Sequence, residues 1–175
     1  ESFYIGDLAD KIDEYSKNTG GILRKEDLAK FKAEWVEPIK TSYKGFEINE
    51  IPPNGHGIVA LMALNIMEGF DVKTHDDADS VHKQIEAMKL AFVDGQRYIS
   101  DPRYMKVTKE ELLSKEYAKK RRKLICHDAI MPEYGDPSCG GTVYLCTADG
   151  EGNMVSFIQS NYCGFGSGVV VPGTG

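Results

Sequence analysis

The chain has 175 residues and a formal net charge of −6, and 41% of its residues are hydrophobic. This length fits one domain or a piece of a larger one, and the negative charge argues against nucleic acid as a partner. The longest apolar stretch, residues 57–67, contains Asn65 and is too short to cross a bilayer, so no membrane segment is expected.

The N-terminal region carries two helical patterns and one hairpin pattern. Apolar residues at steps of three and four predict an amphipathic helix that ends at Gly20 and Gly21; they are Ile5, Leu8, Ile12 and Tyr15. A short helix is predicted over 25–32. Alternating apolar residues on either side of Lys44 and Gly45 predict a small hairpin within residues 37–51.

The middle of the chain is mostly helical. Residues 58–67 are apolar on every face of a helix and are therefore expected to be buried. A longer amphipathic helix is predicted over 78–99; its apolar positions are Val81, Ile85, Met88 and Phe92. Two short helices over 109–113 and 115–124 follow.

The second of these short helices contains a basic run, residues 119–123. Five adjacent charges point all round a helix, which is typical of a solvated helix end. Residues 127–141 lose the helical pattern and are expected to form a long connection.

The last part of the chain changes character. Ten of the 18 glycines follow residue 134, which favours strands joined by tight turns over long helices. Residues 142–148 and 154–160 are both β-prone, and 149–153 between them predict a hairpin loop. Helices first and a glycine-rich β-segment last indicate the α+β class.

Pairing these two strands brings two hydroxyl residues together. If the loop is symmetric, Ala148 faces Met154, and Thr142 then faces Ser160 at the far end of the hairpin. A bulge in the loop would shift this register by one residue.

Thr142 follows Gly140 and Gly141 at the start of a strand. Its hydroxyl could attack the carbonyl of Gly141 and cut the chain there, because glycine tolerates the bent backbone that this attack needs. The freed α-amine could then act as the base for the same hydroxyl. Taken alone, Gly-Gly-Thr before a strand is more often an ordinary turn.

The sequence resembles the γ-glutamyltransferase family, and within it the acylase-like bacterial branch. Residues 140–156 and 165–168 are similar to the start of that family's small subunit. Upstream, short motifs match the C-terminal half of the large subunit in the same order; they lie at 20–23, 25–28, 43–45, 51–53 and 101–102. The resemblance thus spans essentially the whole chain.

The resemblance implies a fold, a reaction and roles for particular residues. The fold would be part of the αββα sandwich of N-terminal-nucleophile hydrolases. The precursor would cleave itself between Gly141 and Thr142, and Thr142 would then serve as nucleophile and amine base. Ser160 matches a position whose hydroxyl orients the nucleophile. Neither a cofactor nor a metal belongs to this chemistry.

The implied substrate is a γ-glutamyl compound such as glutathione, and water, an amino acid or a peptide would accept the acyl group. The family usually has an asparagine at the position of Tyr162, where it helps to hold the substrate's α-amine; here Asn161 lies one position earlier. This departure leaves two alternatives open: a glutaryl or cephalosporin-type acylase, and a family member that has lost turnover and acts as a binding module.

Residues 1–141 would belong to the large subunit and 142–175 to the small subunit of one precursor, together forming an incomplete domain. We expect both natural ends to be missing, the oxyanion-hole and carboxylate-binding residues to lie outside the chain, and the fragment alone to be inactive and to self-associate. The compartment is left open.

Other reactive residues carry ordinary expectations. The four cysteines lack metal or disulfide spacing and are expected to be reduced, partly buried thiols. His75 and His82 lie near several aspartates, but at a helix start that favours acidic residues without any metal. The glycine-rich segment 164–168 is not followed by a helix, which excludes a phosphate-binding loop.

Overall fold

The structure is a computed structural model that describes residues 1–72, 74, 77–132, 142–160 and 166–174, with the backbone alone for 142–145. The described chain is a mixture of helices and antiparallel hairpins, so the predicted α+β class is confirmed. Two compact units are present: residues 35–136 form one, and 1–34 together with 137–175 form the other.

Three helices begin the second of these units: α1 (Ser2–Ile5), α2 (Asp7–Asn18) and α3 (Lys25–Lys30). The prediction of one continuous helix at the start was wrong, because Gly6 adopts an extended conformation and breaks it. A side chain there would also meet the Ser2 backbone at 2.8 Å, so the break depends on glycine. The end of α2 agrees with the prediction: Gly20 has a φ of 76°, which glycine adopts without strain.

The hairpin β1 (Ile39–Tyr43) and β2 (Phe46–Glu50) confirms the predicted one. Tyr43 faces Phe46 across a two-residue turn, and Lys44 and Gly45 both have positive φ. Such a turn matches the twist of the flanking strands, which explains the strong hairpin signal in the sequence.

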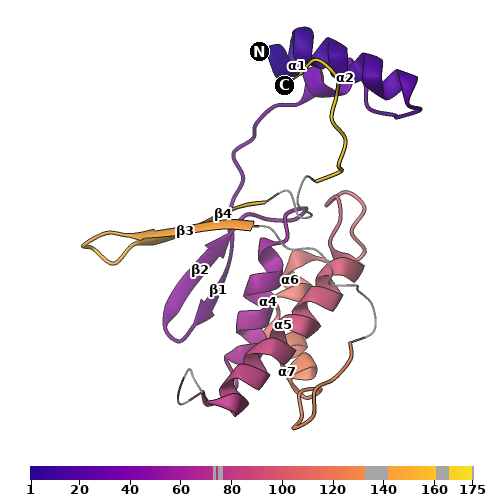
Figure 1. Ribbon diagram of the computed structural model, residues 1–175. Helices are drawn as coiled ribbons and strands as arrows, with labels where there is room; N and C mark the ends of the chain where they lie inside the picture. The colour runs from indigo at the N-terminus through magenta and orange to yellow at the C-terminus, as the bar shows by residue number, and fades with distance from the viewer. Residues whose placement is uncertain (73, 75–76, 133–141, 161–165, 175) are drawn as a thin grey trace. The chain divides into compact units, whose positions relative to one another are not determined.

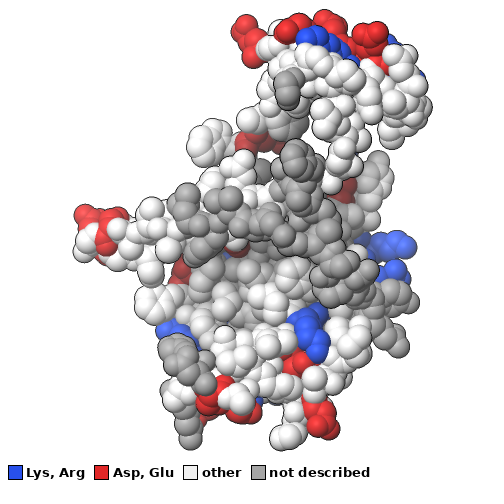
Figure 2. All heavy atoms as spheres, viewed as in Figure 1, with Lys and Arg blue, Asp and Glu red and all other residues white. Residues whose placement is uncertain are grey.

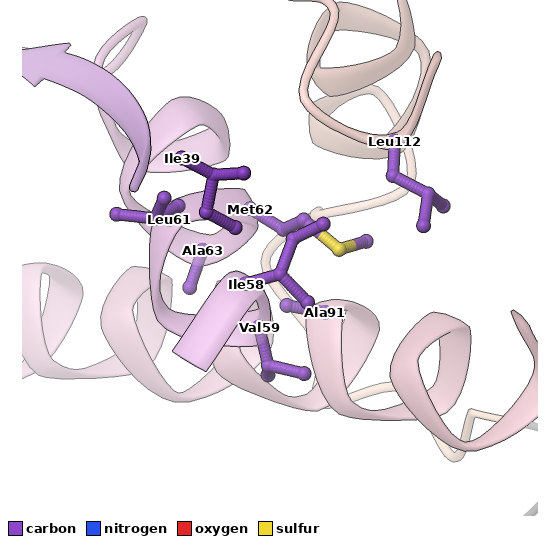
Figure 3. Packing of buried hydrophobic residues seen from close by; sticks show 8 residues of the cluster. All are labelled: Ile39, Ile58, Val59, Leu61, Met62, Ala63, Ala91 and Leu112. Carbon is purple, nitrogen blue, oxygen red and sulfur yellow. The ribbon is translucent and has the colours of Figure 1, made fainter. Parts of the chain in front are cut away.

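Helix α4 (Gly57–Met67) forms the centre of the larger unit. It contacts both strands of the β1–β2 hairpin, α5 and α7, as Figure 1 shows. Ile58, Leu61 and Ile66 are at most 1% exposed, so the predicted burial of this uniformly apolar helix is confirmed. In Figure 3 its side chains meet Ile39 of β1 and Ala91 of α5.

Helix α5 (Ala78–Tyr98) has the predicted extent and starts where Asp77 accepts a hydrogen bond from Ser80 N at 2.9 Å. Its buried face differs from the one that the apolar pattern indicates. Small residues face α4 and allow close approach: a side chain on Gly95 would come within 2.6 Å of Val59 Cγ2. The larger apolar side chains lie on an adjacent face and are 39–53% exposed; they are Val81, Ile85, Met88 and Phe92.

Two short helices complete this unit: α6 (Lys109–Leu112) and α7 (Lys115–Arg122). The interpretation of the basic run as a solvated helix end was only partly right. Arg122 donates through Nε to Ile66 O (2.6 Å) and through Nη2 to Asn65 O (2.8 Å), which satisfies carbonyls at the end of α4.

Arg121 in the same run lies 2.9 Å from Asp94 Oδ2 through its Nε. Neither of these two buried atoms has a hydrogen bond of good geometry, so the contact is an ion pair rather than a directed bond. Burial raises the pKa of Asp94 above its ordinary value, and the positive charge of Arg121 offsets part of this rise.

Asn65, the polar residue in the apolar stretch, connects three elements. Its Oδ1 accepts from Thr41 Oγ1 of β1 and from Lys115 Nζ of α7, both at 2.5 Å. Its Nδ2 donates to Leu113 O at 2.9 Å. Because Asn65 is only 1% exposed, these bonds replace the water that its amide loses on folding.

Candidate active site

The C-terminal hairpin consists of β3 (Thr142–Ala148) and β4 (Met154–Ser160), with the bounds that the sequence predicted. Ala148 faces Met154, and the ladder runs without a bulge to Thr142, which faces Ser160. The predicted register is therefore confirmed.

The loop between the strands is closed by one side chain. Asp149 Oδ1 accepts from the backbone N–H groups of Glu151 (2.9 Å) and Asn153 (3.0 Å), and Oδ2 accepts from Asn153 Nδ2 (2.8 Å). Gly152 has a φ of 88°, a conformation that strains other residues. The hydrogen bond from the Asn153 side chain is the main cause that lowers the pKa of Asp149, and backbone N–H donors add to it.

The ladder also determines what kind of pair Thr142 and Ser160 form. Opposed pairs in antiparallel strands alternate between hydrogen-bonded and non-hydrogen-bonded. Asp149 N donates to Asn153 O at 3.0 Å, and the Thr142–Ser160 pair lies an odd number of steps further along. It is therefore a non-hydrogen-bonded pair, in which Cα atoms are about 4.5 Å apart.

The other predicted site residues lie outside the described part of the chain: Gly141, Asn161 and Tyr162. Thr142 is described by its backbone alone, and Ser160 is exposed. Asp149, Gly152 and Asn153 match the family's turn in the sequence and were expected to be structural. The structure adds the hydrogen bonds by which the Asp149 carboxylate closes this turn.

The described side chains of the hairpin are exposed on both of its faces. Every residue of β4 is exposed, including Phe157 at 53% and Ile158 at 62%. Figure 2 shows acidic side chains at the tip of the hairpin, where Asp149 and Glu151 lie exposed. A two-stranded hairpin is at best marginally stable in water, and these apolar side chains are of a kind that sheets cover with further structure.

Among the described residues, the remaining reactive side chains form no second site. Cys126 and Cys146 are free thiols, and both are exposed, so the expected partial burial was wrong for these two. His82 Nε2 lies 2.8 Å from Cys126 O, and His75 is outside the described residues. In the described ranges no three His, Cys, Asp or Glu side chains converge as metal ligands would, and no helix there has the length and apolarity to cross a membrane.

Comparison with known proteins identifies this arrangement of helices followed by a hairpin. The profile of the family described as Gamma-glutamyltranspeptidase matches residues 1–175. The chain is 36% identical over 176 residues to the glutathione hydrolase-like YwrD proenzyme of Bacillus subtilis, covering 99% of this chain and 33% of that protein. It is also 36% identical over 181 residues to the acylase ACY 1 proenzyme of a Pseudomonas species, covering 100% of this chain and 32% of the relative.

A solved structure agrees with these relatives. The crystal structure of cephalosporin acylase from Bacillus halodurans superposes with a TM-score of 0.81 at 61% identity, covering 100% of this chain and 32% of that chain. The fold and the hairpin thus place the chain among N-terminal-nucleophile hydrolases. The chain belongs to the γ-glutamyltranspeptidase family, and it spans about a third of the length of the curated relatives that it matches.

Proposed function

We propose that the protein containing this chain is a self-processing amidohydrolase and acyltransferase, cut between Gly141 and Thr142. The observation that carries the proposal is the pairing of Thr142 with Ser160. The curated relatives named above are both described as proenzymes, which supports processing here as well.

In the proposed cleavage, Thr142 Oγ1 attacks the carbonyl carbon of Gly141. The Gly141–Thr142 amide becomes an ester as the nitrogen leaves and takes up the hydroxyl proton. Water then hydrolyses the ester, which releases the Gly141 carboxylate and leaves Thr142 with a free α-amine and a restored hydroxyl. The same side chain is thus prepared for turnover by the first reaction.

In turnover, the Thr142 amine would take the hydroxyl proton, since an unperturbed α-amine has a pKa of about 7.7–8.0. Oγ1 attacks the substrate amide, the amine product leaves with a proton, and an acyl-threonine ester remains. Water, an amino acid or a peptide then accepts the acyl group. Ser160 would orient Oγ1 during both reactions, because opposed non-hydrogen-bonded positions bring their side chains close.

The proposed tertiary context is an αββα sandwich with residues 1–141 in the large subunit and 142–175 in the small subunit. The open faces of the β3–β4 hairpin support this assembly, since Phe157 and Ile158 need a covering layer. The exposed apolar face of α5 supports it in the same way. By itself the segment would self-associate through such faces, and a monomer in sedimentation velocity would contradict this.

We propose γ-glutamyl compounds of the glutathione type as substrates, consistent with the family and with the glutathione hydrolase-like relative. A second candidate is a glutaryl or cephalosporin-type acylase. It is favoured by the likeness to the Bacillus halodurans acylase and by Tyr162 at the position where the family usually has asparagine. Tyrosine lacks the amide that would hold a substrate α-amine.

The cleavage proposal is tested by intact mass of the full-length protein. Wild type should yield two chains, the smaller starting at Thr142, and Thr142→Ala should remain one chain. Thr147→Ala, on the same strand but within the ladder opposite Val155, is the matched control and should be cut normally. An uncut wild type after prolonged incubation would end the proposal.

The substrate proposal is tested by comparing kcat/KM for γ-glutamyl and glutaryl anilides. Higher γ-glutamyl turnover supports the first candidate, and equal or higher glutaryl turnover supports the acylase. A mechanism-based glutamine analogue should label Thr142 in the processed protein; absence of both labelling and turnover would indicate a binding module instead.

A further inference from the structure

The two residues of the proposed site lie at one end of the hairpin, whereas the structure that sets their register lies at the other end. Shifting an antiparallel strand by one residue moves all of its side chains to the opposite face. Thr142 would then oppose a different residue, and Ser160 would face away from it. The loop 149–153 therefore determines whether the two hydroxyl residues meet.

Within that loop, the contacts converge on Asp149. Its two carboxylate oxygens accept three hydrogen bonds, at 2.9, 3.0 and 2.8 Å, from Glu151 and Asn153. Its own N–H donates to Asn153 O at 3.0 Å, and Gly152 N donates to Asp149 O at 3.3 Å. These bonds span the loop completely and make Ala148–Met154 the first pair of the ladder.

Further support for the register is weak. All of the β4 side chains are exposed, so packing in the described residues does little to discriminate between registers. The apolar residues of β4 also fall on both faces: Met154, Val155, Phe157 and Ile158 are 53–69% exposed. Within the described residues, a slipped hairpin would therefore expose a similar apolar surface, so the 149–153 loop is the local feature that discriminates between registers.

We propose that Asp149 is a positioning residue for self-cleavage: its carboxylate closes the 149–153 loop and thereby fixes the register that sets Ser160 opposite Thr142. This inference rests on the proposed function, since it concerns the efficiency of the cut before Thr142. Asp149 does not touch the reacting atoms, and it acts through the length of the hairpin.

The chain offers a direct reporter of this register. Cys146 faces Ser156, an even number of steps from the Thr142–Ser160 pair, so it is also a non-hydrogen-bonded pair. Cα atoms in such pairs are about 4.5 Å apart, within the range of about 4.4–6.8 Å for disulfides. Ser156→Cys should therefore form a disulfide with Cys146 only when the register is correct.

The experiment uses the full-length precursor and follows the fraction of uncut chain with time. Asp149→Ala should slow the cut by about tenfold, the effect of losing bonds of this kind at an exposed site. The cleavage rate of Asp149→Asn should lie between those of Asp149→Ala and wild type, because the amide oxygen of the new asparagine still accepts from the two backbone N–H groups. Glu151→Ala is the matched control: it removes one negative charge from the same loop, keeps the backbone donor, and should be cut like wild type.

The disulfide separates positioning from general destabilisation. Oxidation of Asp149→Ala/Ser156→Cys with diamide should lock the register and restore cleavage to within about threefold of wild type, and reduction should abolish the gain. If Cys146→Ser is added to this variant, oxidation should not raise its cleavage rate. This control excludes the other thiols as the cause of the rescue.

Two outcomes would overturn the inference. One is equal cleavage rates for Asp149→Ala and Glu151→Ala in a precursor that is cut normally as wild type. The other is a slow Asp149→Ala variant that the correctly formed disulfide does not rescue. An uncut wild type would instead refute the proposed function, so the two failures are distinguishable.

Discussion

Removing the side-chain amide of Asn65 tests the polar connection between α4, β1 and the α6–α7 turn. Asn65→Ala loses bonds to Thr41, Lys115 and Leu113 O. We assign about 1 kcal/mol to each of these bonds. The bond from Lys115 receives no extra contribution for its charge, because that lysine is exposed to solvent. The free energy of unfolding therefore falls by about 3 kcal/mol. Alanine's higher helix propensity returns about 0.6 kcal/mol, which leaves a net loss of about 2.4 kcal/mol.

Hydrogen exchange of α4 amides in the full-length protein measures this change where it occurs. A loss of this size corresponds to about 50-fold faster exchange in residues 57–67. Asn49→Ala is the matched control, because Asn49 is exposed on β2 and its side chain bonds only to Glu47, at 3.3 Å, among the described contacts. Exchange that changes less than threefold in Asn65→Ala, or equally in both variants, would refute the reasoning.

Two further predictions concern a charged cap and the hairpin loop. Arg122→Ala removes the two bonds that satisfy carbonyls of α4, and should speed hydrogen exchange in residues 64–68 by about tenfold, whereas Lys120→Ala at an exposed position of α7 should not. The pKa of Asp149 is lower in the folded hairpin than its ordinary value of 3.8. The ionised Asp149 carboxylate therefore contributes its full stabilisation of the hairpin above pH 3.8, and this stabilisation declines as the pH falls towards the folded pKa. The difference in hairpin protection between wild type and Asp149→Asn should therefore be constant from pH 5 to 8 and shrink below pH 4, and a difference that grows on acidification would contradict the assignment.

Local chemistry explains why the hairpins were predictable. Lys44 and Gly45 form a turn with positive φ at both positions, and its geometry leaves one register for β1 and β2. The loop from Asp149 to Asn153 acts similarly for β3 and β4, so the opposition of Thr142 and Ser160 followed from counting residues. Such features depend on short-range contacts that a linear pattern contains.

Helix surfaces were less predictable because they depend on the partner. The apolar pattern of α5 correctly indicated a helix, but α4 accepts a face with small residues such as Ala91 and Gly95, since its own side chains are large. Arg121 and Arg122 looked like a solvated charge run, and only the position of α7 beside α4 and α5 gives them Asp94 and the α4 carbonyls as partners.

By itself, the sequence determined the order of helices and hairpins, the register of the β3–β4 hairpin and the family, because each depends on neighbouring residues or on motifs in a fixed order. Tertiary structure decided which helix faces are buried, that Gly6 breaks the first helix, and that Asn65 and the two arginines bond across elements. The physical reason is that burial and hydrogen-bond satisfaction belong to pairs of surfaces, and a sequence lists only one member of each pair at a time.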